Sequence, residues 1–295
     1  MEKTPTELLI KTLPKSAKVV LGTVSGMLAT VLVHPLDVIK NRLQLQEKKL
    51  CTMQMARLIV RCEGFKALYV GLTAGLMRQA TSTTTRLTTY HILNEYYKGL
   101  NTHDKVTIGI YAGLAGALVG NPSEVALVRM MADGPSPCSV RRCPRRYRGV
   151  LHAFYRIVRE DGFFTLWRGG SLTMYRSMLV STAQIGTYAE VNEFLRQNQV
   201  LQNYYTTHVV TSMASSLVTT ILSLPIDVVK TRYQVRSDTM TQRDILNEIV
   251  LRKGIRYLWK GVTPYFMRMF IYTTGHLMFF EFFAEKFFRK EDKKV

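Results

Sequence analysis

The 295-residue sequence predicts an all-α membrane protein built from three related units. Two observations carry this prediction. A proline-centred motif and its downstream companion occur three times, about one hundred residues apart, which is typical of repeats that pack into one structure. Apolar stretches that approach the ~20 residues of a membrane span occur six times. They lie near residues 17–34, 72–93, 106–122, 170–191, 206–226 and 262–284.

The first half of the motif joins a proline to charged residues. In the first copy Pro35 is followed by Asp37 and then by Lys40. The other copies read Pro122-Ser123-Glu124-Val125-Ala126-Leu127 and Pro225-Ile226-Asp227-Val228-Val229-Lys230. Proline kinks a helix, and an acid and a base three residues apart share one helix face. Three such kinks brought together would form a ring of acids and bases that closes one end of a bundle. The simpler alternative is a kinked helix whose carboxylate faces water.

The second half of the motif ends in a glycine. Glu63-Gly64, Asp161-Gly162 and Lys253-Gly254 lead, at identical spacing, to Tyr69-Val70-Gly71, Trp167-Arg168-Gly169 and Trp259-Lys260-Gly261. The distances from proline to closing glycine are 36, 47 and 36 residues, so the middle copy carries an insertion.

Each closing glycine is followed by two polar positions. Arginine stands seven residues on, at Arg78, Arg176 and Arg268, and Arg86, Gln184 and His276 stand eight residues further. Eight residues are a little over two helical turns, so each pair lies on nearly one helix face. The sequence therefore predicts a polar stripe on the second helix of every unit.

Nine helices follow from these patterns. We expect them over residues 15–46, 52–62, 71–97, 105–131, 150–160, 170–195, 204–235, 243–252 and 262–288. The three short ones should lie on the surface, and the unit boundaries should fall at 1–104, 105–200 and 201–295. The long loops lie on one side and carry most of the exposed Lys and Arg, which places that side toward the more interior compartment.

The composition limits the function classes. The net charge of +19 fits either nucleic acid or an anionic lipid together with an anionic solute. The basic residues are scattered, and neither zinc-finger spacing nor an RNA-binding aromatic motif occurs, so a basic helical nucleic-acid-binding protein is the weaker alternative. The sequence has no nucleophile elbow, phosphate loop or clustered metal ligands. We therefore expect neither an enzyme nor a metal site.

The triple pattern of proline-x-acid-x-x-base, acid-Gly and aromatic-x-Gly resembles the mitochondrial carrier family over essentially the whole chain. Residues 71–90, 122–134 and 224–234 are most similar to members that exchange 2-oxoglutarate for malate. The resemblance implies six transmembrane helices in three-fold pseudosymmetry and a monomer that exchanges small dicarboxylates across the mitochondrial inner membrane. It also implies long loops in the matrix and termini in the intermembrane space. Another anion carrier, of the malate–phosphate or proton-leak type, is the alternative within transport.

The resemblance also assigns residues. Arg78, Arg176 and Arg268 fall on the substrate contact points, and Arg86, Ser82, Gln184 and His276 are further candidates in the cavity. The matrix-side gate comprises Asp37, Lys40, Gln44, Glu124, Arg129, Asp227, Lys230 and Gln234. Gly71, Gly169 and Gly261 begin helices whose amides hold the phosphate of cardiolipin, in line with the anion affinity of helix N-termini. Cardiolipin is then a structural lipid, and no other cofactor is expected.

Four departures from the family pattern bear on these roles. Leu127 stands at the base position of the second copy, so we expect Glu124 to lack one of its partners. Ser82 stands where the 2-oxoglutarate-exchanging members have a tyrosine. Met131 replaces a bracing glutamine, and Lys253 replaces an acid. At the opposite end of the bundle no acid–base pair survives within any copy, so we expect that gate to be weak.

Overall fold

The computed structural model describes residues 15–46, 50–97, 102–133, 147–197, 204–235 and 240–291. Within these ranges the chain is helical. The elements are α2 (Lys15–Leu45), α3 (Thr52–Glu63), η1 (Phe65–Tyr69), α4 (Leu72–Tyr96), α5 (Thr102–Ala132), α6 (Val150–Asp161), η2 (Phe163–Trp167), α7 (Gly170–Gln197), α8 (Tyr204–Val235), α9 (Gln242–Lys253), η3 (Ile255–Trp259) and α10 (Val262–Glu291).

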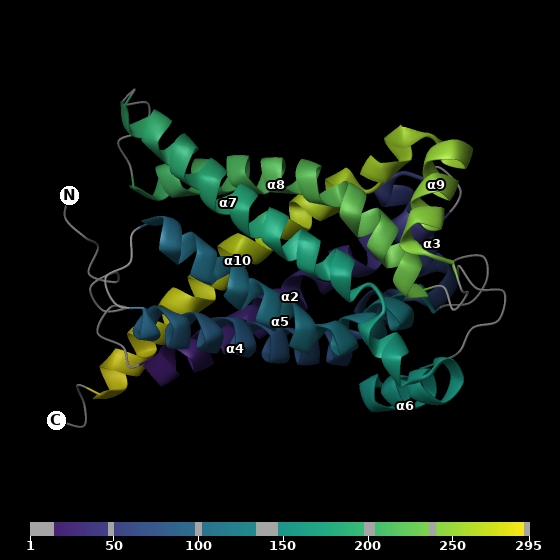
Figure 1. The fold of residues 1–295 in the computed structure, drawn as a ribbon, viewed down its shortest axis with the longest axis horizontal. Coiled ribbons are helices and arrows are strands. Elements are labelled where there is room, and N and C mark those ends of the chain that lie inside the picture. The colour runs from purple at the N-terminus through teal and green to yellow at the C-terminus, as the bar shows by residue number, and fades with distance from the viewer. Residues whose placement is uncertain are drawn as a thin grey trace.

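The six long helices form a closed ring. Each packs against the next in the order α2, α4, α5, α7, α8, α10, and α10 returns to α2. The short helices α3, α6 and α9 gather at one end of the ring, on the right in Figure 1. The all-α prediction is therefore confirmed, and the nine predicted helices agree with the described ones to within a few residues at each boundary.

Each proline of the motif lies inside a continuous long helix, Pro35 in α2, Pro122 in α5 and Pro225 in α8. By length and composition alone, two of the described helical segments, Ala17–Leu45 and Val210–Val235, could cross a membrane. The other four long helices span 25 to 31 residues.

A five-residue 3₁₀-helix in each repeat was not predicted. Each one starts after the first glycine of the motif's second half, at Gly64, Gly162 and Gly254, and leads to the closing glycine. All six of these glycines have φ between 80° and 91°. Glycine adopts this left-handed region readily because it has no Cβ. The two glycines of each motif therefore allow the chain to turn from the surface helix into the next long helix.

Helices α4 and α5 approach each other closely at Ser82. A Cβ atom built on Gly120 would lie 2.9 Å from the Ser82 Cβ, and one built on Gly116 would lie 2.8 Å from the Ser82 carbonyl oxygen. Two glycines on α5 and a small residue on α4 therefore let the two backbones pack together, which gives Ser82 a packing role beside the cavity.

Candidate functional site

A cavity of about 590 Å³ lies inside the helix ring. The second helix of every repeat contributes to it, with Arg78, Ser82 and Arg86 from α4, Arg176 from α7, and Arg268 and His276 from α10. The predicted polar stripe thus lines one space, as far as the structure describes it. The side chain of Gln184 falls outside the described side chains. Lys18 and Phe280 also line the cavity, so it extends toward the end of the ring opposite α3, α6 and α9.

The cavity wall is strongly basic. Among its described lining residues Glu124 is the single acid, whereas five side chains are Lys or Arg. Arg78 and Arg86 form no ion pair with any described residue, although Arg78 lies within electrostatic reach of Glu124. An anionic solute of small size fits these surroundings.

The floor of the cavity is a layer of charged residues. Arg78, Arg176, Arg268 and Glu124 line the cavity, and they also line a second space of about 60 Å³ on the side of the short helices. Around this second space the Lys40 Nζ atom lies 2.7 Å from Asp227 Oδ2, and the Lys230 Nζ atom lies 2.7 Å from Glu124 Oε1. The ring of acids and bases predicted from the three motifs therefore forms and separates the cavity from that end of the molecule.

The expectation that Leu127 deprives Glu124 of a partner is wrong. Pairing runs from the base of one repeat to the acid of another, so Lys230 of the third repeat serves Glu124 of the second. By the same order, a base at position 127 would form an ion pair with Asp37 of the first repeat. Asp37 is instead paired with Arg268 from the cavity layer.

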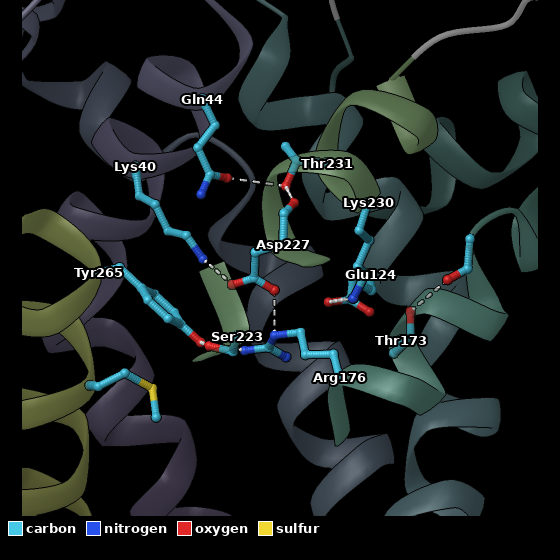
Figure 2. A network of polar contacts seen from close by, with 12 residues as sticks. Lys40, Gln44, Glu124, Thr173, Arg176, Ser223, Asp227, Lys230, Thr231 and Tyr265 are labelled. Carbon is cyan, nitrogen blue, oxygen red and sulfur yellow. Dashed lines mark hydrogen bonds and ion pairs between the residues drawn. The ribbon is translucent and has the colours of Figure 1, made fainter. Parts of the chain in front are cut away.

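A buried tyrosine that the motifs did not indicate connects the two layers. The Tyr265 hydroxyl oxygen accepts hydrogen bonds from Arg176 Nη2 and from Ser223 Oγ, both at 3.0 Å. The Lys40 Nζ atom lies 3.6 Å from the centroid of the Tyr265 ring. Figure 2 shows Arg176 and Lys40 meeting at the two oxygens of Asp227, with Tyr265 beside them. Tyr265 stands where the other repeats have Gly75 and Thr173, so repetition gave no signal for it.

With this geometry established, comparison with known proteins identifies the family. The family model described as mitochondrial carrier protein matches residues 11–101, 98–199 and 202–291. The chain belongs to the mitochondrial carrier family. Members of this family are transporters, so the protein is a carrier of the mitochondrial inner membrane and not an enzyme. The three matches follow the three predicted units, whose boundaries stay predictions.

The carrier is similar to named relatives over most of its length. It is 41% identical over 288 residues to the mitochondrial 2-oxoglutarate/malate carrier protein of Bos taurus, covering 92% of this chain and 91% of the relative. It is 41% identical over 271 residues to the protein of that name from Caenorhabditis elegans, covering 87% and 88%. It is 33% identical over 280 residues to mitochondrial uncoupling protein 5 of Arabidopsis thaliana, covering 82% and 88%.

The remaining predicted gate residues of the carrier lie behind the ring. The Gln44 Oε1 atom accepts a hydrogen bond from Thr231 Oγ1 at 3.2 Å, and Gln234 Nε2 lies 3.5 Å from the Arg168 carbonyl oxygen. Arg129 pairs with Asp161 of its own repeat and not with the gate acids. Arg129 therefore lies behind the ring of ion pairs, and its role in the gate stays a prediction.

Three arginines at equivalent positions connect the repeats of the carrier through the backbone. The Nε atoms of Arg42, Arg129 and Arg232 donate to the carbonyl oxygens of Met131, Gln234 and Gln44, at 3.0, 3.0 and 3.3 Å. Each bond joins one repeat to another, so the three together close a cycle around the gate. Met131 takes part through its backbone although it cannot act as a bracing amide.

The three closing glycines lie immediately before α4, α7 and α10, with φ of 81° at Gly71, 80° at Gly169 and 91° at Gly261. An open space of about 420 Å³ adjoins Gly169 and is lined by Arg168, Ser171 and Gln242, among others. This helix start therefore adjoins an open space that has a cation beside it.

Proposed function

We propose that this carrier exchanges small dicarboxylates, 2-oxoglutarate for malate, across the inner membrane by alternating access. The observation that carries the proposal is the layer of three arginines from three repeats at the floor of one basic cavity. A guanidinium group can hold a carboxylate through two parallel hydrogen bonds, so two such groups suit a dicarboxylate. Relatives 41% identical over nine-tenths of the chain carry the name 2-oxoglutarate/malate carrier, which supports this substrate class.

The arginines occupy two levels. Arg78, Arg176 and Arg268 share one register in the repeats, and Arg86 lies about 12 Å further along α4 at ~1.5 Å per residue. We assign the substrate to the three-arginine level. Arg86 and His276 then contact the anion as it enters the cavity. Ser82 adjusts the space between Arg78 and Arg86.

The proposal includes a topology. The six long helices are the membrane spans, and polar residues on them are tolerated where they face a cavity and not lipid. The short helices α3, α6 and α9 lie at the matrix side and the termini in the intermembrane space. The structure then corresponds to a carrier closed on the matrix side by its ion-pair ring. Exchange is obligatory when substrate is required to open that ring, because only a ligand with different affinity for two states can shift them. Function as a monomer without nucleic acid stays a prediction.

Counter-exchange in liposomes tests the substrate. Protein reconstituted with internal malate should take up labelled 2-oxoglutarate, and Arg78→Ala should lower uptake more than tenfold, because losing a hydrogen bond to a charged group costs about 1.5–3 kcal/mol. Arg78→Lys should restore little, since lysine lacks the fork. The exposed Arg61→Ala on α3 is the matched control and should leave exchange unchanged.

Transport assays with other ions distinguish this function from the two alternatives. Uptake of phosphate with no uptake of 2-oxoglutarate would show a malate–phosphate type of carrier, and proton conductance without exchange would show a leak type. Either result would overturn the dicarboxylate assignment.

We propose further that cardiolipin binds at Gly71, Gly169 and Gly261. The free amides of a helix start favour a phosphate group, and Arg168 adds a positive charge beside Gly169. Cardiolipin should therefore raise the melting temperature of the detergent-solubilised carrier, and Gly169→Ala should reduce that increase. Gly162→Ala is the matched control, because Gly162 has φ of 91° and suffers the same backbone strain away from a long-helix start. An equal cardiolipin effect in both variants would contradict the site.

A further inference from the structure

The gate ring lacks one of its three bases. Lys40 on α2 pairs with Asp227 on α8, and Lys230 on α8 pairs with Glu124 on α5. To complete this cycle, the residue at position 127 of α5 would pair with Asp37 on α2. Leu127 is a buried apolar residue that lines the small space of the ring and cannot supply the charge.

Arg268 fills this vacancy from another layer. Its side chain comes from α10, and it forms an ion pair with Asp37 in which the two side chains are 14% and 11% exposed. Among the described residues no other cation pairs with Asp37. Arg176 makes a comparable contact with Asp227, but Asp227 also has Lys40 as a partner. The first repeat's acid therefore depends on a cavity arginine in a way that the other two acids do not.

Arg268 also belongs to the cavity. It lines the 590 Å³ space together with Arg78 and Arg176, and it lines the 60 Å³ space of the ring as well. The two arginines Arg78 and Arg268 hold equivalent positions in the first and third repeats, yet Arg78 forms no ion pair among the described residues. Both arginines line the cavity and the ring space, but of the two Arg268 alone forms an ion pair with an acid of the gate motifs.

We infer that Arg268 is the third cation of the matrix-side gate, in place of the base missing at position 127, and at the same time a substrate contact. The second half of this inference rests on the proposed function. A substrate carboxylate and Asp37 then compete for one guanidinium group. When the carboxylate binds Arg268, Asp37 loses its partner and the ring loses its third ion pair. Substrate binding and weakening of the gate are thereby coupled through one side chain.

The test separates gate closure from transport. Gate closure is read from the melting temperature of the purified carrier without substrate, and transport from counter-exchange in liposomes. Arg268→Ala should lower the melting temperature by several degrees and abolish exchange. Arg78→Ala, the matched control, should abolish exchange and leave the melting temperature within a degree of the parent.

A base at position 127 provides the decisive rescue. In Arg268→Ala/Leu127→Lys the new lysine stands in the position of Lys40 and Lys230, so the melting temperature should return to near the parent value. Exchange should stay absent, because the substrate contact is still missing. In the Asp37→Asn background, Arg268→Ala should lower the melting temperature no further, because the ion pair is already broken. The effects of mutating two residues that contact each other do not add.

The gate role would be overturned if Arg78→Ala and Arg268→Ala lowered the melting temperature equally. It would also be overturned if Leu127→Lys did not restore the melting temperature of Arg268→Ala. If Arg268→Ala does not fold, Arg268→Lys tests the gate role instead. It keeps the ion pair, so its melting temperature should match that of the parent while exchange falls at least tenfold. The melting experiments need no substrate and remain valid if the transported anion differs from the one proposed. A failure of the proposed function is therefore distinguishable from a failure of this inference.

Discussion

The arginine that stands two residues after each gate motif is held by an acid in the first two repeats and by an aromatic ring in the third. Arg42 binds both oxygens of Glu63 at 2.5 and 2.9 Å, and Arg129 pairs with Asp161. Arg232 lies 4.8 Å from the centroid of the Tyr257 ring, and its Nη2 atom donates to the Tyr257 hydroxyl at 2.7 Å.

Two sequence changes in the third repeat account for this difference together. Lys253 stands where the other repeats have Glu63 and Asp161, and Tyr257 stands where they have Ala67 and Thr165. The side chains of Lys253 and Lys260 also lie over the Tyr257 ring, 5.2 and 4.8 Å from its centroid. The negative face of an aromatic ring attracts cations, so a tyrosine can replace an acid as the partner of a buried guanidinium.

The comparison shows which contact the fold retains. All three arginines donate from Nε to a backbone carbonyl of another repeat, whether an acid or a ring orients the guanidinium. The bond between repeats is common to them, and the group that orients the arginine varies. Removing an orienting group should therefore weaken the end of the carrier that holds α3, α6 and α9 in any repeat, by an amount that depends on the group.

The largest effect is expected from Glu63→Gln. Arg42 is 1% exposed, and it would keep a buried charge without its counter-ion, which costs about 3–5 kcal/mol for a broken buried pair. The melting temperature in detergent measures this loss. Glu160→Gln on α6 is the control, since its pair with Arg156 is about one-third exposed and is worth ~0–1 kcal/mol. Similar losses in the two variants would show that Glu63 does not orient Arg42.

Much of this architecture could be predicted from the sequence because repetition marks it. The proline motif and the closing glycine recur in all three copies, so they located the long helices, the surface helices and the polar stripe. The 3₁₀-helices were missed because five residues are too few to show a periodic pattern. Whether the residues so located bind substrate or lipid stays a prediction.

Partner choice could not be predicted in the same way. Glu124 and Lys230 lie in different repeats, and their pairing follows from how α5 and α8 meet in three dimensions. Tyr265 and Tyr257 each occupy a position where the other repeats have a small residue. A comparison of the three copies therefore does not reveal them. A repeated motif indicates what the copies share, whereas these contacts depend on what one copy has alone.

The smaller effect is expected from Tyr257→Phe, which keeps the ring under the cations and removes the hydroxyl. Arg232 then loses its 2.7 Å acceptor, and the Gln46 carbonyl oxygen loses a donor at 2.5 Å. A hydrogen bond to a charged group is worth about 1.5–3 kcal/mol, so the loss in stability should be smaller than that of Glu63→Gln. Melting temperatures of the two variants, measured in the same detergent, give this order directly.

Adding an acid should repair the third repeat in the manner of the first. In Tyr257→Phe/Lys253→Glu the new carboxylate stands where Glu63 meets Arg42, so it can pair with Arg232 and should recover most of the lost melting temperature. Tyr257→Phe/Lys253→Ala is the control, because it removes the lysine charge beside Arg232 without supplying an acid. If the alanine variant recovers as much as the glutamate variant, repulsion between cations explains the gain, and the equivalence of acid and ring across the repeats is refuted. Recovery by glutamate alone would establish that the third repeat exchanged one orienting group for another while its bond to the first repeat stayed the same.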